Sequence, residues 1–259
     1  MNFEIKSESN FDYVDVGKGP VLLLLHGLFG ALSNWKQVIE AYKEKYRVII
    51  PLLPIYQMPL PKTSVGGLSD FVHDFVKLKN LKDFHVLGNS LGGHVALVYT
   101  LEHGEYVKSI VLTGSSGLYE NSMGGSFPKR NNYDFIRERV EYTFFDPDVA
   151  SKELVDEVFH IVNTRSKALR IVHMAKSAIR HNLRKEIPQI KIPACLIWGK
   201  NDKITPPEVA EEFHSLFTDS ELHFIENCGH APMMEKPEQF NNALAPFLEK
   251  AEALAKISD

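Results

Sequence analysis

The chain has 259 residues, of which 44% are hydrophobic and 24% charged, and this length and composition fit a globular protein with one large core. Its formal net charge of -4 leaves no basic excess for nucleic-acid phosphates, and no apolar run approaches the roughly 18 residues of a membrane span. The first residues lack the apolar core of a secretory signal, so we expect a cytoplasmic protein.

The N-terminal third of the chain alternates between predicted strands and helices. Val21 to Leu25 is a continuous apolar run, as in a parallel strand that is buried on both faces. Residues 68–78 carry apolar side chains close to a 3.6-residue period, which predicts an amphipathic helix. The other elements expected here are strands at 3–6, 11–16 and 46–50 and a helix at 32–43. Strands that alternate with helices indicate a parallel sheet covered on both faces.

The segment G-N-S-L-G at 88–92 lies between an apolar strand and a predicted helix at 91–101. A serine flanked in this way, between a strand and a helix, is the nucleophile-elbow pattern, which exposes the serine oxygen at the carboxyl edge of a sheet. Ser90 is therefore the candidate nucleophile.

The alternation of strands and helices stops between residues 117 and 188. Helices are predicted there at 137–144, 152–162 and 165–183, with no strand between them. The other elements expected in the second half are strands at 107–113, 193–199 and 221–225 and a last helix at 237–255. Thr205 is followed by prolines and a glutamate, which predicts a helix start with Thr205 as its N-cap.

A serine hydroxyl is a weak nucleophile at neutral pH and needs a base and a group that orients the base. In sheets that carry this elbow, the chain order is serine, acid, histidine. Asp202 lies in the loop after the strand at 193–199, and His230 lies in the loop after the strand at 221–225. This order predicts Asp202 and His230 as the partners of Ser90. As an alternative, Asp202 serves only an Asx turn before the next helix.

A tetrahedral intermediate also needs backbone N–H groups directed at its oxyanion. Leu91, the residue after the nucleophile, is one predicted donor because it begins a helix. The second predicted donor is Leu28, in the loop that follows the strand at 21–25. We expect His26 to brace this loop and not to act as a base.

Four motifs occur in the order typical of the α/β-hydrolase superfamily, which the chain resembles from roughly residue 11 to its C-terminus. They are H-G at 26–27, G-N-S-L-G-G at 88–93, W-G-K-N-D at 198–202 and G-H-A-P at 229–232. The resemblance implies an α/β fold with an eight-stranded, mostly parallel, twisted sheet flanked by helices. It implies Ser90 as nucleophile, His230 as base and Asp202 as orienting acid. It also implies a core formed by residues 1–117 and 188–259 and a helical lid, or cap, at 118–187.

Two regions depart from the superfamily or stand out within the chain. Most members carry an acid and a glycine-rich turn after the strand at 46–50, whereas residues 51–59 here read P-L-L-P-I-Y-Q-M-P. We expect this segment to pack in the core, with a pocket wall beside Phe29 and Leu91 as the alternative. The stretch 165–185 holds seven basic residues and no acidic one. A solvated helix face is expected there, and attraction of an acidic substrate is the alternative.

These features predict a serine hydrolase that hydrolyses a carboxylic ester of a small, mainly apolar molecule through an acyl-enzyme. We expect no cofactor and no metal, because the sequence has neither a phosphate-binding loop nor metal-ligand spacing. The expected partner is a small-molecule ester substrate, with no nucleic acid and no membrane span, and the oligomeric state is open. One alternative is a carbon–carbon bond hydrolase of vinylogous diketones (meta-cleavage type), whose members usually carry Trp where this chain has Ala231. Another is a ligand-binding signal or regulatory protein that keeps the triad.

Overall fold

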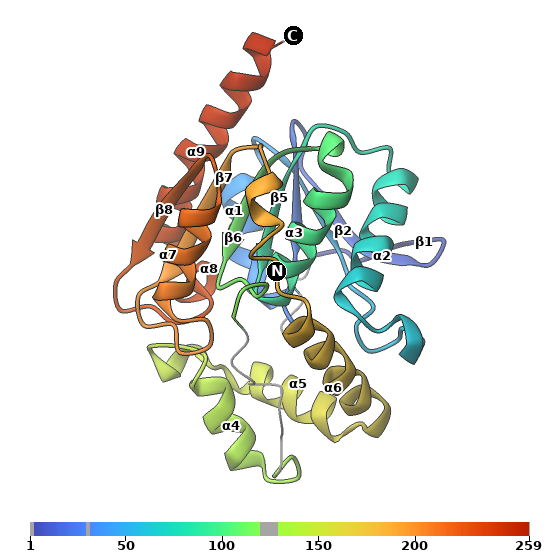
Figure 1. Cartoon of the computed structure of the whole chain (residues 1–259). Coiled ribbons are helices and arrows are strands. Elements are labelled where there is room, and N and C mark those ends of the chain that lie inside the picture. Colours follow the sequence, from blue (N-terminus) through green and yellow to red (C-terminus); the bar gives the residue numbers. More distant parts are fainter. Residues whose placement is uncertain (1–2, 30–31, 120–128, 259) are drawn as a thin grey trace.

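The computed structural model describes residues 3–29, 32–119 and 129–258. An eight-stranded sheet with the order β1-β2-β4-β3-β5-β6-β7-β8 organises the chain (Figure 1). β2 pairs antiparallel with β1 and β4, and all other neighbouring strands pair in parallel. The strands are β1 (Lys6–Glu8), β2 (Phe11–Val16), β3 (Val21–Leu25), β4 (Arg47–Pro51), β5 (Phe84–Asn89), β6 (Val107–Thr113), β7 (Ala194–Gly199) and β8 (Ser220–Ile225).

The central strands are buried because helices cover both faces of the sheet. Every residue of β5 and of β7 is buried, as expected for parallel strands with apolar sequences. Figure 1 shows α2 (Val65–Leu78), α3 (Leu91–His103) and α7 (Pro207–Leu216) on one side. The opposite face contacts α1 (Lys36–Tyr42), α8 (Pro232–Glu235) and α9 (Pro237–Ser258). The two faces therefore carry two separate buried clusters.

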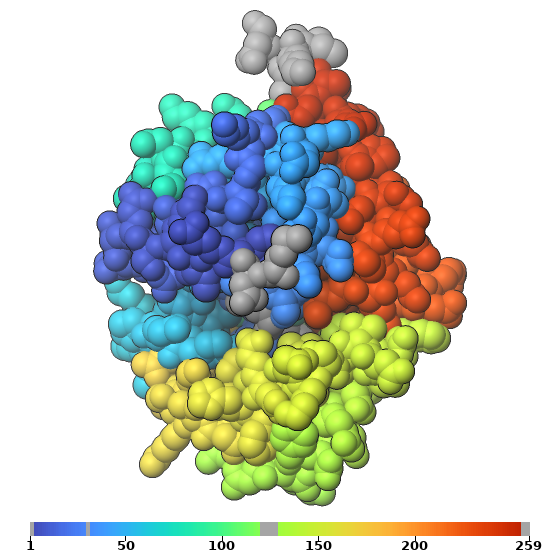
Figure 2. All heavy atoms as spheres, turned by 180° about the vertical axis from the view of Figure 1, so that it is seen from behind, coloured from blue at the N-terminus to red at the C-terminus, as the bar shows by residue number. Residues whose placement is uncertain are grey.

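Between β6 and β7, the residues that the structure describes form three α-helices and no strand, as predicted: α4 (Tyr133–Glu141), α5 (Lys152–Asn163) and α6 (Arg165–Arg180). They lie together below the sheet in Figure 1, and from behind they form a continuous yellow-green to yellow layer in Figure 2. Ile136 and Val158 from these helices belong to the same buried cluster as Leu24 and Trp35. Met174 and Ala178 of α6 belong to the other cluster, so the helical segment packs against the apolar clusters of both faces of the sheet.

Several predicted boundaries were wrong, and a tight turn and a side-chain hydrogen bond explain two of them. The strand expected at 3–6 lies at Lys6–Glu8, because a tight turn after it sets Glu8 opposite Phe11 in the hairpin. The helix expected at 137–144 begins at Tyr133, because the Asn132 side chain accepts a hydrogen bond from the first turn. The helix expected at 32–43 begins as a short 3-10 helix, Ser33–Trp35, before α1.

The prediction that Thr205 caps a helix was also wrong. α7 begins at Pro207 with Pro206 as its N-cap residue. The Thr205 hydroxyl instead donates to Asp202 Oδ2 at 2.9 Å, so it belongs to the polar network of the site.

The apolar segment at 51–59 packs in the core, which confirms the packing interpretation. Leu53, Ile55 and Met58 are buried against α2 and its neighbours. No residue of this segment is among the described residues that line the cavity beside Ser90, so its alternative role as a wall of that cavity was wrong. Separately, none of the helices that the structure describes is long and apolar enough to cross a membrane.

Candidate functional site

Ser90 sits on a sharp turn between β5 and α3. Its backbone has φ 54° and ψ -120°. This conformation is unfavourable for any residue that has a Cβ, and it is kept only where surrounding contacts enforce it. Its N–H donates to Thr113 O at 3.1 Å, and its carbonyl accepts the N–H of Ser116 at 3.2 Å. A Cβ at Gly92 would lie 2.0 Å from the Leu25 carbonyl oxygen, so only glycine lets α3 start this close to β3. These contacts hold Ser90 at the carboxyl edge of the sheet.

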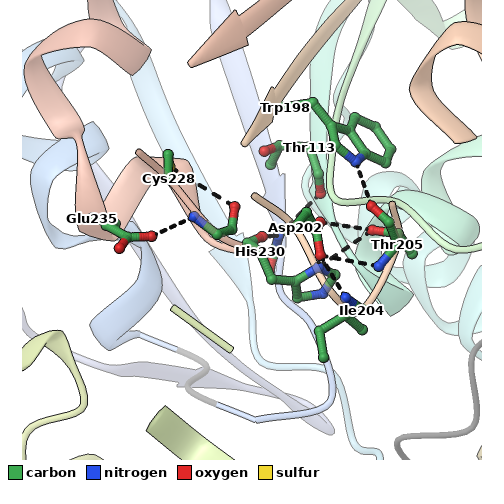
Figure 3. A network of polar contacts seen from close by, with 10 residues as sticks. Thr113, Trp198, Asp202, Ile204, Thr205, Cys228, His230 and Glu235 are labelled. Carbon is green, nitrogen blue, oxygen red and sulfur yellow. Dashed lines mark hydrogen bonds and ion pairs between the residues drawn. The ribbon is translucent and has the colours of Figure 1, made fainter. Parts of the chain in front are cut away.

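Asp202 and His230 are joined by a hydrogen bond. His230 Nδ1 lies 2.8 Å from Asp202 Oδ2, and the Asp202 side chain is fully buried (Figure 3). The other carboxylate oxygen, Oδ1, accepts the backbone N–H groups of Ile204 at 2.8 Å and Thr205 at 3.0 Å. Asp202 therefore forms an Asx turn and binds His230 at the same time, so its part in the turn does not prevent it from contacting the histidine.

The polar contacts of His230 fix which ring nitrogen faces the cavity. A carboxylate only accepts hydrogen bonds, so Nδ1 donates to Asp202 and Nε2 is left as an acceptor. The His230 N–H donates to Thr143 O at 2.8 Å, and the Asn89 side chain donates to His230 O at 3.3 Å. His230 and Ser90 line the same cavity.

Both predicted oxyanion donors line this cavity as well. Leu91 is the first residue of α3, and the N–H groups of a first helical turn have no partner within the helix. A Cβ at Gly27 would lie 3.3 Å from Ser90 Cβ, so the loop that carries Leu28 passes next to the serine. The geometry therefore brings Leu28 and Leu91 to the side of Ser90.

The cavity has a volume of about 270 Å³ and is lined mostly by apolar side chains. Phe29 is among them, as predicted, whereas Asp202 lies behind His230 and is not. The helical segment supplies lining residues that the sequence did not single out, namely Arg139, Val140, Thr143, Phe144, Leu154, Val158, Met174, Ala175 and Ala178. The spacing of Met174 and Ala178 on one face of α6 was the available signal for its part in the lining.

Two side chains brace the loop that carries Leu28. His26 Nε2 accepts the N–H of Leu53 at 2.9 Å, and its Nδ1 contacts Gly27 O at 2.8 Å, which confirms the expected bracing role. Burial lowers the pKa of His26 to about 4, so the ring is neutral near pH 7. The Tyr56 hydroxyl donates to the Leu28 carbonyl. Nothing in the sequence marked Tyr56, because its partner is 28 residues away.

The basic side chains of the stretch 165–185 do not line the cavity, although Met174, Ala175 and Ala178 of α6 do. Lys176 and Arg180 line a separate surface depression beside the start of α2, and Arg184 pairs with Glu212 at 2.6 Å. Arg139 is instead the arginine among the cavity-lining residues that the structure describes. This placement favours the solvated-face interpretation of the basic stretch.

The two cysteines are buried and free. Burial, together with the nearby Glu235 carboxylate, raises the pKa of the Cys228 thiol, so it stays protonated and is a poor nucleophile. Within residues 3–29, 32–119 and 129–258, no three His, Cys, Asp or Glu side chains are grouped to hold a metal ion.

Comparison with known proteins places this geometry in a family. The sequence model of the alpha/beta hydrolase family matches residues 22–243. The chain is 32% identical to a 2-hydroxy-6-oxo-6-(2'-aminophenyl)hexa-2,4-dienoic acid hydrolase of Metapseudomonas resinovorans, over 92% of this chain and 87% of that protein. It is 28% identical to the monoacylglycerol lipase ABHD6 of Mus musculus, over 90% of this chain and 76% of that protein.

A solved structure agrees. MGS-MChE2, an alpha/beta hydrolase enzyme from the metagenome of sediments of the Mar Chica lagoon in Morocco, is 42% identical with a TM-score of 0.80, over 96% of this chain and 99% of that one. The family match covers most of the sheet and all four motif positions. The chain therefore belongs to the alpha/beta hydrolase family of enzymes.

Proposed function

We propose that the protein is a serine hydrolase that cleaves carboxylic esters of small, mainly apolar molecules. The observation that carries this proposal is that Ser90, on its strained turn, shares one cavity with a His230 ring that Asp202 orients. A hydroxyl, a base and an orienting acid in this order are the parts that nucleophilic acyl transfer requires.

In the proposed reaction, Ser90 Oγ attacks the ester carbonyl while His230 Nε2 takes the hydroxyl proton. The imidazolium that forms is stabilised by Asp202, whose carboxylate is already bound at Nδ1. The N–H groups of Leu28 and Leu91 receive the oxyanion. His230 then gives its proton to the leaving alcohol, and water releases the acyl group by the same steps in reverse.

The cavity supports the assignment of the substrate class. Its volume of about 270 Å³ lies near the lower end of the volumes of small-molecule binding sites, and its lining is mainly apolar. We assign the cover of this cavity to α4, α5 and α6 as a lid, because each of them contributes lining residues. On this proposal, residues 118–187 form the lid, and residues 1–117 with 188–259 form the core.

Carbon–carbon bond hydrolysis is the second candidate. The identity of 32% with a dienoic acid hydrolase favours it. Ala231, which follows the histidine where that branch usually has Trp, favours the ester hydrolase. A panel that compares p-nitrophenyl butyrate with a 2-hydroxy-6-oxo-dienoate separates the two candidates, because the favoured substrate should give the higher kcat/KM.

The proposal is tested with a fluorophosphonate probe, which forms a bond only with an activated serine. The native protein should be labelled and should hydrolyse p-nitrophenyl butyrate, whereas Ser90→Ala should do neither. Ser116→Ala is the matched control, because this buried serine also lines the cavity and should remain dispensable for labelling. Labelling of Ser90→Ala at the native rate would contradict the proposal.

A further inference from the structure

Glu235 is a buried carboxylate that the proposed reaction does not use. It is the last residue of α8 and only 9% exposed. Its Oε2 accepts the N–H of Gly229 at 2.6 Å, and its Oε1 accepts the N–H of Asp146 at 2.6 Å. Figure 3 shows the bond to Gly229, the residue directly before His230. One side chain thus connects the histidine loop with the segment that follows α4.

Other hydrogen bonds also hold the backbone of the histidine loop, and one of them runs from the N–H of Asn201 to the carbonyl of Cys228 at 2.9 Å. The N–H of His230 donates to Thr143 O at 2.8 Å, and the carbonyl of His230 accepts from the Asn89 side chain at 3.3 Å. A Cβ at Gly229 would lie 2.6 Å from Thr143 O, so the loop packs directly against the end of α4. Glu235 holds both sides of this contact at once, because it binds Gly229 and Asp146.

We infer that Glu235 is a positioning residue for His230, an inference that rests on the proposed function. Its carboxylate fixes the peptide before His230 relative to the end of α4, and so sets the position from which the imidazole reaches Ser90 Oγ. A displacement of a catalytic group by about 1 Å costs on the order of 100-fold in rate. The two 2.6 Å bonds are therefore placed where they affect the chemical step.

Two acceptor oxygens are needed for this role. Glu235→Gln keeps the size of the side chain but has one oxygen and one NH₂ group, so it satisfies one backbone N–H and presents a donor to the other. Glu235→Asp keeps both oxygens but is one methylene shorter, so it does not span the same two N–H groups. Both substitutions should loosen the histidine loop without changing the residues that line the cavity.

Glu252→Gln is the matched control. Glu252 on α9 also receives two donors, His85 Nε2 at 2.8 Å and Lys108 Nζ at 2.7 Å. These partners lie near the starts of β5 and β6, at the opposite ends of the strands from Ser90. Losing this carboxylate should lower stability without moving the histidine loop.

The experiment measures Tm by circular dichroism, kcat and KM for p-nitrophenyl butyrate, and the rate of fluorophosphonate labelling. We expect Glu235→Gln and Glu252→Gln to have a lower Tm than the native protein. Glu235→Gln should lower kcat and the labelling rate by at least tenfold with KM within twofold of native, and Glu235→Asp should fall between it and native. Glu252→Gln should leave kcat within twofold. If Glu235→Gln does not fold, Glu235→Asp carries the same test.

A Glu235 variant that folds and keeps the native kcat would overturn the inference, whether its KM rises or stays the same. The proton between His230 Nδ1 and Asp202 gives a second readout that needs no activity. Its downfield ¹H NMR signal should shift or broaden in Glu235→Gln and stay unchanged in Glu252→Gln. If the native protein is not labelled, the proposed function fails, while this signal still decides whether Glu235 positions His230.

Discussion

The substitution Asp202→Asn tests the proposed orientation of His230 because the structure dictates how the new amide must lie. Two backbone N–H groups, those of Ile204 and Thr205, point at Oδ1 at 2.8 and 3.0 Å. The amide oxygen has to stay at this position, so the NH₂ group takes the place of Oδ2 and faces His230 Nδ1. An NH₂ group donates a hydrogen bond, so it forces the proton of the imidazole onto Nε2.

A ring protonated at Nε2 cannot accept the proton of Ser90. The expected loss in kcat is about 10⁴-fold, which corresponds to about 5 kcal/mol in activation free energy, by analogy with the same change in serine protease triads. The assay is hydrolysis of p-nitrophenyl butyrate at pH 7, together with the rate of fluorophosphonate labelling. Both rates should fall in parallel, because both depend on the activated serine.

Thr205→Val is the control for this prediction. It removes the hydroxyl that donates to Oδ2 at 2.9 Å but leaves the carboxylate and therefore the tautomer of His230. Its kcat should fall by about tenfold or less, as for the loss of one hydrogen bond. If Asp202→Asn kept more than a tenth of the native kcat, the argument that Asp202 sets the tautomer would be refuted.

Three further substitutions test other parts of the structure. Arg139→Gln should lower kcat/KM for an anionic hemisuccinate ester about fivefold relative to a neutral butyrate ester, which is the effect of one exposed ion pair. Arg137→Gln is the control and should not have this effect, because the Arg137 guanidinium already pairs with acids on its own helix. Tyr56→Phe should lower kcat about fivefold at constant KM, because it frees the Leu28 carbonyl; a change in KM alone would contradict this. Burial lowers the pKa of His26 to about 4, below the usual value of about 6.5, so below pH 6.5 the unfolded chain binds a proton that the folded protein excludes. Acidification from pH 7.5 to 5 should therefore cost about 2 kcal/mol of unfolding free energy at this group, and urea unfolding of His26→Gln should show a correspondingly weaker pH dependence.

The sheet and its order of elements were predictable because the relevant signals are local. The apolar runs that became β3, β6 and β7 are short, which favours strands over helices, and their predicted bounds agree with the structure within one residue. Boundaries failed where a single hydrogen bond decided them. The cap at Asn132 and the hydroxyl of Thr205 each depend on one atom whose partner no periodicity reveals.

The candidate catalytic residues of the site were predictable from the sequence, but the residues that hold them in place were not. Ser90, Asp202 and His230 each follow a strand, and parallel strands end at one edge of a sheet, so their approach follows from topology. Tyr56 and Glu235 carry no such signal. Their partners are backbone groups that only folding brings close. Because nearly every residue carries a backbone N–H and a carbonyl, the sequence does not mark which of these groups will form the bond.

The sequence by itself determined which side chains are available for chemistry, since apolar strands and tight turns leave a serine, an acid and a histidine in loops at one edge. Only the tertiary structure decided how they are held. The bond between His230 and Asp202, the cavity lined in part by α4 to α6, and the neutral state of the buried His26 ring arise from contacts across 27 residues or more. Such contacts form when packing removes water from polar groups, and that free energy depends on the whole fold and on no single segment.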